Sequence, residues 1–417
     1  MRKSARAGLL LTVLFVSRSV AAPDELPSKW IDPATGHRVV RLSREGGSTS
    51  FYFHQNAYSA DGTKLVITTP HGLSTIDLST RQIDEVVSGR VRPLVTGRKS
   101  GDIYYLRDDA VWAAKLDTHE TRKVASLPER LQSSNVVVNA DETLIVGLAV
   151  DPDCEAVPKT PPRGQDDSDR LRSRWSAGLP MVIYTIDIAS GQTSIIHHSH
   201  DWLNHLQCSP TDPRQVMFCH EGPWNLVDRT WLIETDGSDL RQVHPRTMDM
   251  EIAGHEFFSA DGKTVWYDLQ TPRSAAFWLA GYDIETGTRT WYQLARNEWS
   301  VHYNASPDGT LFAGDGGGPK SVANQTADRQ PLDPPGNGQW IYLFRPELSE
   351  SIAGPKPVDP AVKTGVLHAE RLVDLSRHNY SLEPNVTFTP DGKWVVFRSN
   401  MHGPTHVYAV EIARSEN

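Results

Sequence analysis

Five of the 16 histidines lie just upstream of a short phrase that recurs along the sequence. They are His54, His205, His255, His302 and His378. An imidazole has an unperturbed pKa of about 6.5, so it can take up a proton near neutral pH or bind a metal ion. Any one of them alone is better explained as a hydrogen-bonded structural residue. Their common position, however, indicates a polar site.

The recurring phrase is a four-residue turn that predicts hairpins. It reads Ser59-Ala60-Asp61-Gly62, Ser259-Ala260-Asp261-Gly262, Ser306-Pro307-Asp308-Gly309 and Thr389-Pro390-Asp391-Gly392, with weaker copies at Asn139-Ala140-Asp141-Glu142 and Ser209-Pro210-Thr211-Asp212. Asp-Gly favours a tight turn, and the β-rich runs that follow, such as residues 64–67 and 394–397, are expected to be returning strands. Hairpins repeated in this way are typical of a β-propeller, whose small sheets bury their faces against their neighbours.

The number of blades is predicted from a second series of strands. Some of these strands run into five-residue turns that begin with Asp and end with Gly, such as residues 187–191 and 283–287. The strands of this series lie at residues 73–78, 111–116, 182–186, 230–234, 277–282, 340–344 and 406–412. We therefore predict an all-β, seven-bladed β-propeller that forms a single domain over residues 23–417. Pro-rich and Gly-rich insertions near residues 151–176 and 314–338 are predicted to be loops over one face of the disc. The innermost strands begin beside the central channel, so the histidines should converge there.

The two ends of the chain are predicted to meet in the last blade. That blade lacks an outer strand, and residues near 30 to 43 have the turn and strand that it needs. A ring closed in this way has no long exposed edge, which favours a soluble monomer.

The first 22 residues have the pattern of a secretory signal, with a basic start, an apolar core and a small-residue cleavage site. We therefore expect a periplasmic or secreted protein with no stable membrane anchor after cleavage. The segment contains four basic and no acidic residues, so the formal charge of -9 becomes -13 for the mature chain. A net acidic protein is a poor general binder of nucleic acid, and an anionic substrate would need a local cluster of cations.

Three cysteines are too few for a disulfide scaffold, so the fold must depend on packed sheets. A bridge between Cys208 and Cys219 is compatible with an oxidising compartment, and the sequence leaves it open.

Several runs in the middle of the chain resemble those of the oligogalacturonate lyases, and the likeness extends over nearly the whole mature chain. They are Asn204-His205-Leu206-Gln207-Cys208-Ser209-Pro210, Phe218-Cys219-His220-Glu221-Gly222-Pro223-Trp224, Val227-Asp228-Arg229-Thr230-Trp231, Glu251-Ile252-Ala253-Gly254-His255-Glu256-Phe257 and Val301-His302-Tyr303-Asn304. The resemblance implies a seven-bladed propeller that cleaves short pectin-derived oligogalacturonides by β-elimination. It also implies a divalent metal ion, usually manganese, near the central channel.

The resemblance assigns the catalytic roles to His255 and Arg229. His255 is the expected base, and Arg229 is expected to stabilise the substrate carboxylate or the leaving oxygen. An ion pair of Arg229 with Asp228 or Glu221 is an equally weighted structural alternative. Substrate-binding or orienting roles are expected for His205, Gln207, His220 and Glu221.

The metal ligands are where this sequence departs from the family pattern. The family takes one ligand from a Val-His motif, here His302, and others from a Gln-x-x-His-x-His group whose three positions hold Tyr380, Glu383 and Asn385 here. His378 lies two residues before Tyr380, and residues 383 and 385 would point the same way on a strand. We therefore expect His302, Glu383, Asn385 and His378 as ligands, a set rich in oxygen that favours Mn²⁺, Ca²⁺ or Mg²⁺ over Zn²⁺. A metal-free protein also fits these substitutions.

The expected function is that of a lyase that cleaves acidic oligosaccharides at C4–C5 of a uronate and leaves 4,5-unsaturated ends. One alternative is a lyase for another uronic-acid oligosaccharide, such as a rhamnogalacturonan fragment or an algal uronate glycan, because the altered ligands and the insertions allow it. The other is a non-catalytic periplasmic propeller that binds protein partners.

Overall fold

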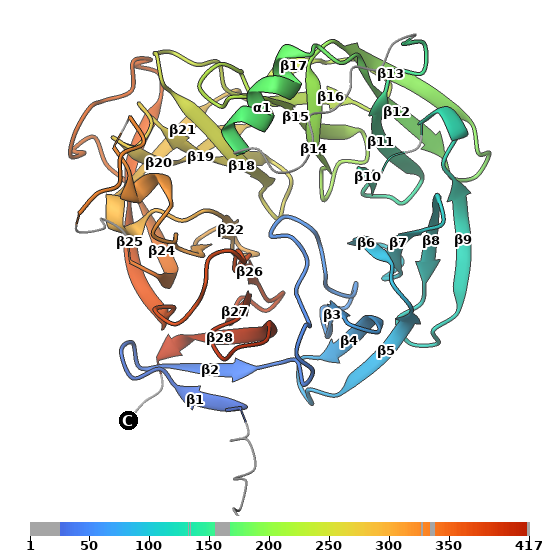
Figure 1. Cartoon of the computed structure of the whole chain (residues 1–417), viewed down its shortest axis with the longest axis horizontal. Helices are drawn as coiled ribbons and strands as arrows, with labels where there is room; N and C mark the ends of the chain where they lie inside the picture. Colours follow the sequence, from blue (N-terminus) through green and yellow to red (C-terminus); the bar gives the residue numbers. More distant parts are fainter. Residues whose placement is uncertain are drawn as a thin grey trace, which may run out of the picture.

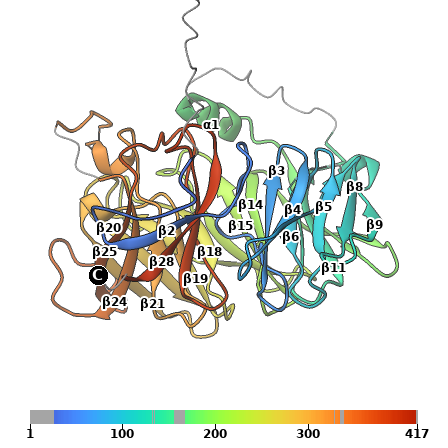
Figure 2. The same cartoon turned by 90° about the horizontal axis from the view of Figure 1, so that it is seen from below.

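A computed structural model describes residues 26–414, apart from residues 132, 134, 155–166, 327 and 334–337. The predicted signal at residues 1–22 lies outside the described residues. The described chain is built mainly of β-strands, in small sheets that are set side by side around a central axis (Figure 1). Seen from the side, the sheets form a thick disc with loops on both faces (Figure 2).

The first half of the chain forms four of these sheets, each with its strands in sequence order. Three strands make the first, β3 (Lys64–Thr69), β4 (Gly72–Asp77) and β5 (Ile83–Ser88). The next contains β6 (Arg92–Thr96), β7 (Ile103–Arg107), β8 (Ala110–Ala114) and β9 (Thr121–Ser126). The third contains β10 (Val136–Val138), β11 (Leu144–Val150), β12 (Met181–Asp187) and β13 (Thr193–Ser199). The fourth contains β14 (Trp202–Cys208), β15 (Gln215–Glu221), β16 (Thr230–Glu234) and β17 (Arg241–Gln242).

The remaining strands form two larger sheets. The eight-stranded sheet has the order β18 (Ile252–Phe258), β19 (Thr264–Gln270), β20 (Phe277–Asp283), β21 (Arg289–Leu294), β25 (Lys363–Asp374), β24 (Trp340–Leu348), β23 (Phe312–Gly314) and β22 (Tyr303–Ala305). The five-stranded sheet has the order β1 (Lys29–Ile31), β2 (His37–Arg41), β28 (His406–Arg414), β27 (Trp394–Ser399) and β26 (Thr387–Phe388). Short 3₁₀ turns lie at Glu129–Leu131, Arg296–Glu298 and Val322–Asn324.

The hydrophobic core lies between neighbouring sheets. One buried cluster joins Leu65 of β3, Ile103 of β7 and Val396 of β27, which belong to three different sheets. A central strand such as β12 is buried on both faces, which explains the apolar run from Met181 to Tyr184.

The recurring Asp-Gly phrases form the predicted hairpin turns. Ser59 Oγ donates a hydrogen bond to Asp61 Oδ1 at 2.6 Å, and the same bond at 2.6 Å recurs in the turns that begin at Ser259, Ser306 and Thr389. The glycines of these four turns have φ between 68° and 71°, a left-handed conformation that glycine adopts without strain. The run after each turn pairs back as an antiparallel strand, for example Phe258 with Val265.

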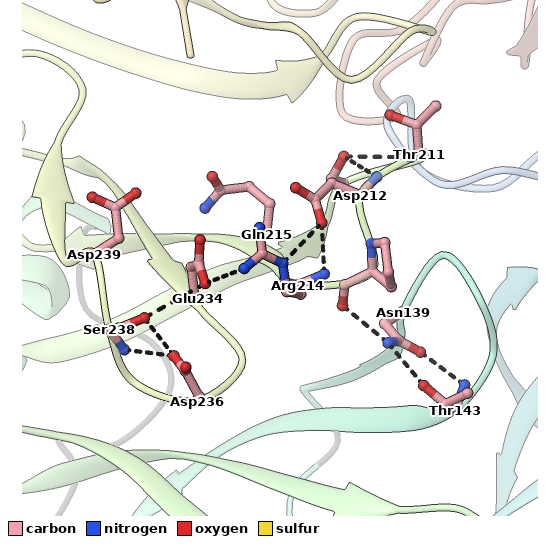
Figure 3. Close-up of polar contacts among 12 residues, drawn as sticks. Asn139, Thr143, Thr211, Asp212, Arg214, Gln215, Glu234, Asp236, Ser238 and Asp239 are labelled. Carbon is pink, nitrogen blue, oxygen red and sulfur yellow. Dashed lines mark hydrogen bonds and ion pairs between the residues drawn. The ribbon is translucent and has the colours of Figure 1, made fainter. Parts of the chain in front are cut away.

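The turns of neighbouring repeats also contact one another. Figure 3 shows Asn139, whose Nδ2 donates to the carbonyl of Pro213 in the next repeat at 3.0 Å. Thr211 Oγ1 in turn donates to the carbonyl of Asp261 at 2.9 Å, one repeat further along. The turns thus link adjacent sheets at one end of the central axis.

Strands from the two ends of the chain pair in one sheet. β2 lies antiparallel to β28, with Val39 opposite Val410 and Val40 opposite Ala409. β1 continues the same sheet on the outer side of β2, as Figure 1 shows.

Part of the first insertion is helical, and not a loop as predicted. Helix α1 (Asp167–Ser176) lies on one face of the disc (Figure 2). Trp175 packs against Gly222, where an added Cβ would meet the indole ring at 2.8 Å. The prediction missed the helix because the insertion is rich in proline and charged residues, which favour a loop. The helix is stabilised instead by the packing of Trp175 on a neighbouring sheet.

Cys208 and Cys219 are not joined by a disulfide. They lie on adjacent strands out of register, since Cys208 is opposite Val216 and Cys219 is opposite Asn204. The described part of the chain contains no helix with the length and apolar character of a membrane span.

Candidate active site

Three histidines occupy equivalent positions, on or directly before the strand that leads into a recurring turn. His205, His255 and His302 each lie four residues before the first residue of a recurring turn. His205 on β14 and His255 on β18 have left-handed φ values of 48° and 53°, and each lies where the pairing of its strand shifts register. A β-bulge re-aims a side chain, and backbone strain of this kind clusters at functional sites.

These histidines come together with His54. The ring centroids of His255 and His302 are 5.0 Å apart. Burial, together with the positive charges that His205 and His302 carry when protonated, lowers the pKa of His54 to about 3. Imidazoles from four of the five predicted segments therefore meet in one region, whereas His378 contacts Leu382, Ser399 and Tyr380 instead.

The environment of His255 suits a base. Burial lowers its pKa well below the ordinary value, and the charges of His302 and Arg229 act in the same direction. Its Nδ1 is buried and has no hydrogen-bond partner among the described residues. A neutral imidazole with an unsatisfied nitrogen can accept a proton or a ligand group at neutral pH.

Arg229 forms ion pairs with two buried carboxylates. Its Nη1 donates to Glu221 Oε1 at 2.5 Å and its Nε donates to Glu256 Oε1 at 2.9 Å, and all three side chains are buried. Burial opposes all three charges, but their mutual attraction outweighs it, so the pKa of Arg229 is raised and that of each carboxyl is lowered. The alternative pairing with Glu221 is therefore present, whereas Asp228 pairs with Arg246 at 3.0 Å.

The expected substrate-binding residues divide into two groups. His205 Nε2 lies 3.2 Å from Glu221 Oε2, and Gln207 Nε2 donates to the Glu256 carbonyl at 2.7 Å, so both lie beside the ion-paired cluster. His220 instead stacks on Trp231, with ring centroids 5.0 Å apart, and its Nδ1 lies 2.8 Å from Asp201. Its contacts are thus with side chains outside the histidine cluster.

Two of the four expected metal ligands are suitably placed. His302 Nε2 lies 3.8 Å from Glu383 Oε2, and His302 Nδ1 lies 2.8 Å from Asp315 Oδ2. A carboxylate behind the histidine in this way is the usual second partner of a metal-bound imidazole. The ring of His255 lies next to that of His302, and its Nδ1 has no hydrogen-bond partner among the described residues. This nitrogen is therefore a further candidate ligand atom at the same place.

Asn385 and His378 are otherwise engaged. Asn385 Oδ1 accepts from the Phe53 backbone and its Nδ2 donates to the Glu383 carbonyl. His378 Nε2 lies 2.7 Å from the Leu382 carbonyl and its Nδ1 lies 2.9 Å from Ser399 Oγ. Within the described ranges, no three His, Cys, Asp or Glu side chains form a metal-binding group. Of the four predicted ligands, the structure thus brings His302 and Glu383 together and leaves Asn385 and His378 bonded to other groups.

Sequence reasoning missed three residues of this cluster. Tyr52 Oη lies 3.1 Å from His302 Nε2, Asp315 supports the other nitrogen of that ring, and Glu256 holds Arg229. Glu256 directly follows His255 in the matched run, so the sequence offered a signal for it. Tyr52 and Asp315 carry no such signal, because only the fold brings them to His302.

A cavity of about 1160 Å³ adjoins the histidine cluster, and its wall includes His54, His205 and Gln207. Among the described residues, its charged lining consists of four arginines and two carboxylates: Arg92, Arg98, Arg174, Arg398, Asp61 and Glu142. The wall is thus net positive in a chain whose formal charge is -9. Such a wall attracts a polyanion by focusing positive potential into a concave site.

Comparisons with known proteins agree with this architecture. An oligogalacturonate lyase of Dickeya dadantii is 27% identical over 406 residues, which cover 92% of this chain and 95% of that protein. An oligogalacturonide lyase of Pectobacterium atrosepticum is 26% identical with the same coverage. A solved oligogalacturonate lyase in complex with manganese has a TM-score of 0.72 at 23% identity, covering 92% of this chain and 96% of that one. Another, from Vibrio parahaemolyticus, has a TM-score of 0.73 at 21% identity, covering 93% and 97%. The family model of the oligogalacturonate lyases matches residues 27–416, and the chain therefore belongs to the oligogalacturonate lyase family.

Proposed function

We propose that this protein cleaves oligogalacturonides by β-elimination, with His255 as the base. The observation that carries the proposal is the buried Nδ1 of a neutral His255, which has no partner among the described residues and belongs to a histidine cluster whose members His54 and His205 line a cavity with a net positive wall. Family membership and relatives named as oligogalacturonate and oligogalacturonide lyases support the same activity.

The reaction needs a proton acceptor and positive charge. His255 takes the proton from C5, the electrons of the C5–H bond form the C4–C5 double bond, and the oxygen on C4 leaves with the bonding pair and then takes up a proton. Negative charge develops on the uronate carboxylate during this step, so a cation beside it lowers the barrier. Arg398 lines the cavity, and its Nε donates to the Glu383 carbonyl at 2.7 Å and its Nη1 to Thr49 Oγ1 at 3.1 Å, so it is the cation of the cavity wall that we propose for this role.

A divalent ion would add to this charge. His302 and Glu383 are the residues that would hold it, and the structure of a related lyase contains manganese. When bound, such an ion supplies Lewis-acid stabilisation of the carboxylate.

The proposal is tested by incubating the purified protein with di- and trigalacturonate and following ultraviolet absorbance. A conjugated, 4,5-unsaturated product should make the absorbance rise, and mass spectrometry should show fragments without added water. A panel of rhamnogalacturonan and algal uronate oligomers in the same assay examines the alternative substrates. Absence of turnover on every oligomer, with manganese supplied, would favour a binding protein over an enzyme.

Glu383→Gln is expected to weaken Mn²⁺ binding at least about tenfold, because the amide removes one of two protein ligands and its charge. Isothermal calorimetry with MnCl₂ measures the affinity directly. The matched control is Glu347→Gln, since Glu347 is an exposed residue that contacts His368. Unchanged binding in both variants would place the ion elsewhere.

We further propose that the sheets form a seven-bladed β-propeller. The eight-stranded sheet divides into β18–β21 and β22–β25 at the parallel pairing of β21 with β25, which yields seven units of three to five strands. The pairing of β2 with β28 then supplies the strand that closes the ring. An experimental structure with six or eight blades would contradict this count.

A further inference from the structure

Arg92 is an arginine of the cavity wall whose guanidinium makes no hydrogen bond or ion pair with a described residue. Its side chain is exposed. Arg398, by contrast, is bonded through its guanidinium to the Glu383 carbonyl and to Thr49 Oγ1. Arg92 therefore presents open donors and an uncompensated positive charge to the cavity.

The position of Arg92 in its repeat is that of a histidine in the repeat before it. Arg92 lies five residues before Gly97, and His54 lies five residues before Ser59. Gly97 and Ser59 begin equivalent turns, because the amide of each donates to the carbonyl of the fifth residue after it. β6 is the innermost strand of its sheet (Figure 1). Arg92 thus lies at the level of the histidines, whereas Arg98 lies in the turn beyond the strand.

Hydrogen bonds between the two segments place Arg92 near His54. Gln55, which directly follows His54, donates through its Nε2 to the carbonyl of Leu94 at 2.9 Å. Leu94 is two residues after Arg92 on β6. Further hydrogen bonds join the two segments closer to their turns. The histidine cluster and the unpaired guanidinium are therefore neighbours along the wall of the channel.

Arg398 and Arg92 lie on either side of the segment that carries His54. Arg398 Nη1 donates to Thr49 Oγ1 at 3.1 Å, five residues before His54, whereas Arg92 is on the strand bonded to Gln55. Both arginines line the same cavity of about 1160 Å³. An oligogalacturonide carries one carboxylate on each sugar residue, so two consecutive sugars can each meet one arginine.

We propose that Arg92 binds the carboxylate of the galacturonate residue that leaves, on the other side of the cleaved bond from the residue that loses its proton. A guanidinium stays protonated at ordinary pH and presents paired donors that match a carboxylate. The inference rests on the proposed function, which it deepens by naming a residue that selects substrates with a free carboxylate beside the cleaved bond. A methyl ester at that place would remove the charge that Arg92 recognises.

Calorimetry on the His255→Asn background, where substrate is not consumed, tests this subsite with two ligands. One is digalacturonate, and the other is the same dimer with a methyl ester on its non-reducing residue, which is the residue that leaves. Arg92→Gln should lower the affinity for digalacturonate about tenfold, the loss expected for a charge-assisted hydrogen bond. The ester should already bind about tenfold more weakly than digalacturonate, and Arg92→Gln should weaken it no further, because the pair is already broken.

The matched control is Arg90→Gln, because Arg90 is exposed two residues before Arg92 and is not part of the cavity wall. It should leave both affinities unchanged. A thermal melt should show that Arg92→Gln is as stable as its parent, since no described residue bonds to the Arg92 guanidinium.

Two binding results would overturn the subsite. One is an affinity for digalacturonate that Arg92→Gln leaves unchanged, and the other is an equal loss for digalacturonate and for the ester. Absence of product from the wild-type protein would instead overturn the lyase proposal, whatever the binding result.

Discussion

Replacing His255 with asparagine is expected to lower kcat for oligogalacturonide cleavage by about 10²- to 10⁴-fold, the usual contribution of a positioned general base. An amide cannot accept the C5 proton, so the variant loses the chemical step. Asparagine also suits the backbone, since φ is 53° at His255 and Asn385 adopts 54° at the corresponding position of another sheet. The initial rate of absorbance increase at saturating trigalacturonate measures kcat, and a thermal melt checks the fold.

The matched control for this variant is His198→Asn. The His198 side chain is 62% exposed and lies outside the cavity wall, so its replacement should leave kcat unchanged. A His255→Asn protein that kept kcat within tenfold of wild type would assign the proton transfer to another group.

The pH profile gives a second readout of the same base. Burial and the charges of His302 and Arg229 hold the pKa of His255 well below 6.5, and a cation on His302 would act in the same direction. A base works only when it is unprotonated, so kcat should persist as the pH falls to 6.5 and should decline only below that. An acidic limb above pH 6.5 would point to a different base.

The recurring turns could be predicted from the sequence because their structure is local. An Asp side chain closes the turn on a Ser or Thr two residues earlier, and glycine supplies the left-handed φ. The convergence of the histidines followed from the same repeat, since equivalent positions of neighbouring hairpins face one channel. His205, His255 and His302 could therefore be grouped without coordinates.

The metal ligands could not be predicted in the same way, because the prediction required residues 383–385 to form an extended strand. Side chains two residues apart share a face only in regular β-structure. Asn385 has a left-handed φ of 54° and β26 begins only at Thr387, so the alternation from Glu383 to Asn385 fails. The amide of Asn385 turns instead to the backbone of Phe53 and Glu383.

The ion pairs of Arg229 could not be predicted from the sequence either, because one of the two carboxylates belongs to a neighbouring sheet. Glu221 lies on β15 of the same sheet as Arg229, and Glu256 lies on β18 of the next one. Only the packing of the two sheets shows that both carboxylates reach the same guanidinium.

Arg229→Met is expected to lower the free energy of unfolding by about 3–5 kcal/mol, because it leaves Glu221 and Glu256 buried without their cation. The side chains are 2%, 5% and 1% exposed, respectively, so water cannot replace the lost partner. Chemical denaturation followed by tryptophan fluorescence measures the change. Adding Glu221→Gln and Glu256→Gln to the same chain should recover much of the loss, since neutral amides remove the unpaired charges.

The matched control is Arg246→Met, which breaks the pair with Asp228. Those side chains are 25% and 39% exposed, so the expected cost is at most about 1 kcal/mol. The comparison decides between the two roles of Arg229, because a structural ion pair and a substrate-binding group respond differently. A stable Arg229→Met protein that had lost activity would restore the role in carboxylate binding. A destabilised one whose stability returns with the paired glutamine substitutions would establish that Arg229 acts by holding β15 and β18 together around His255.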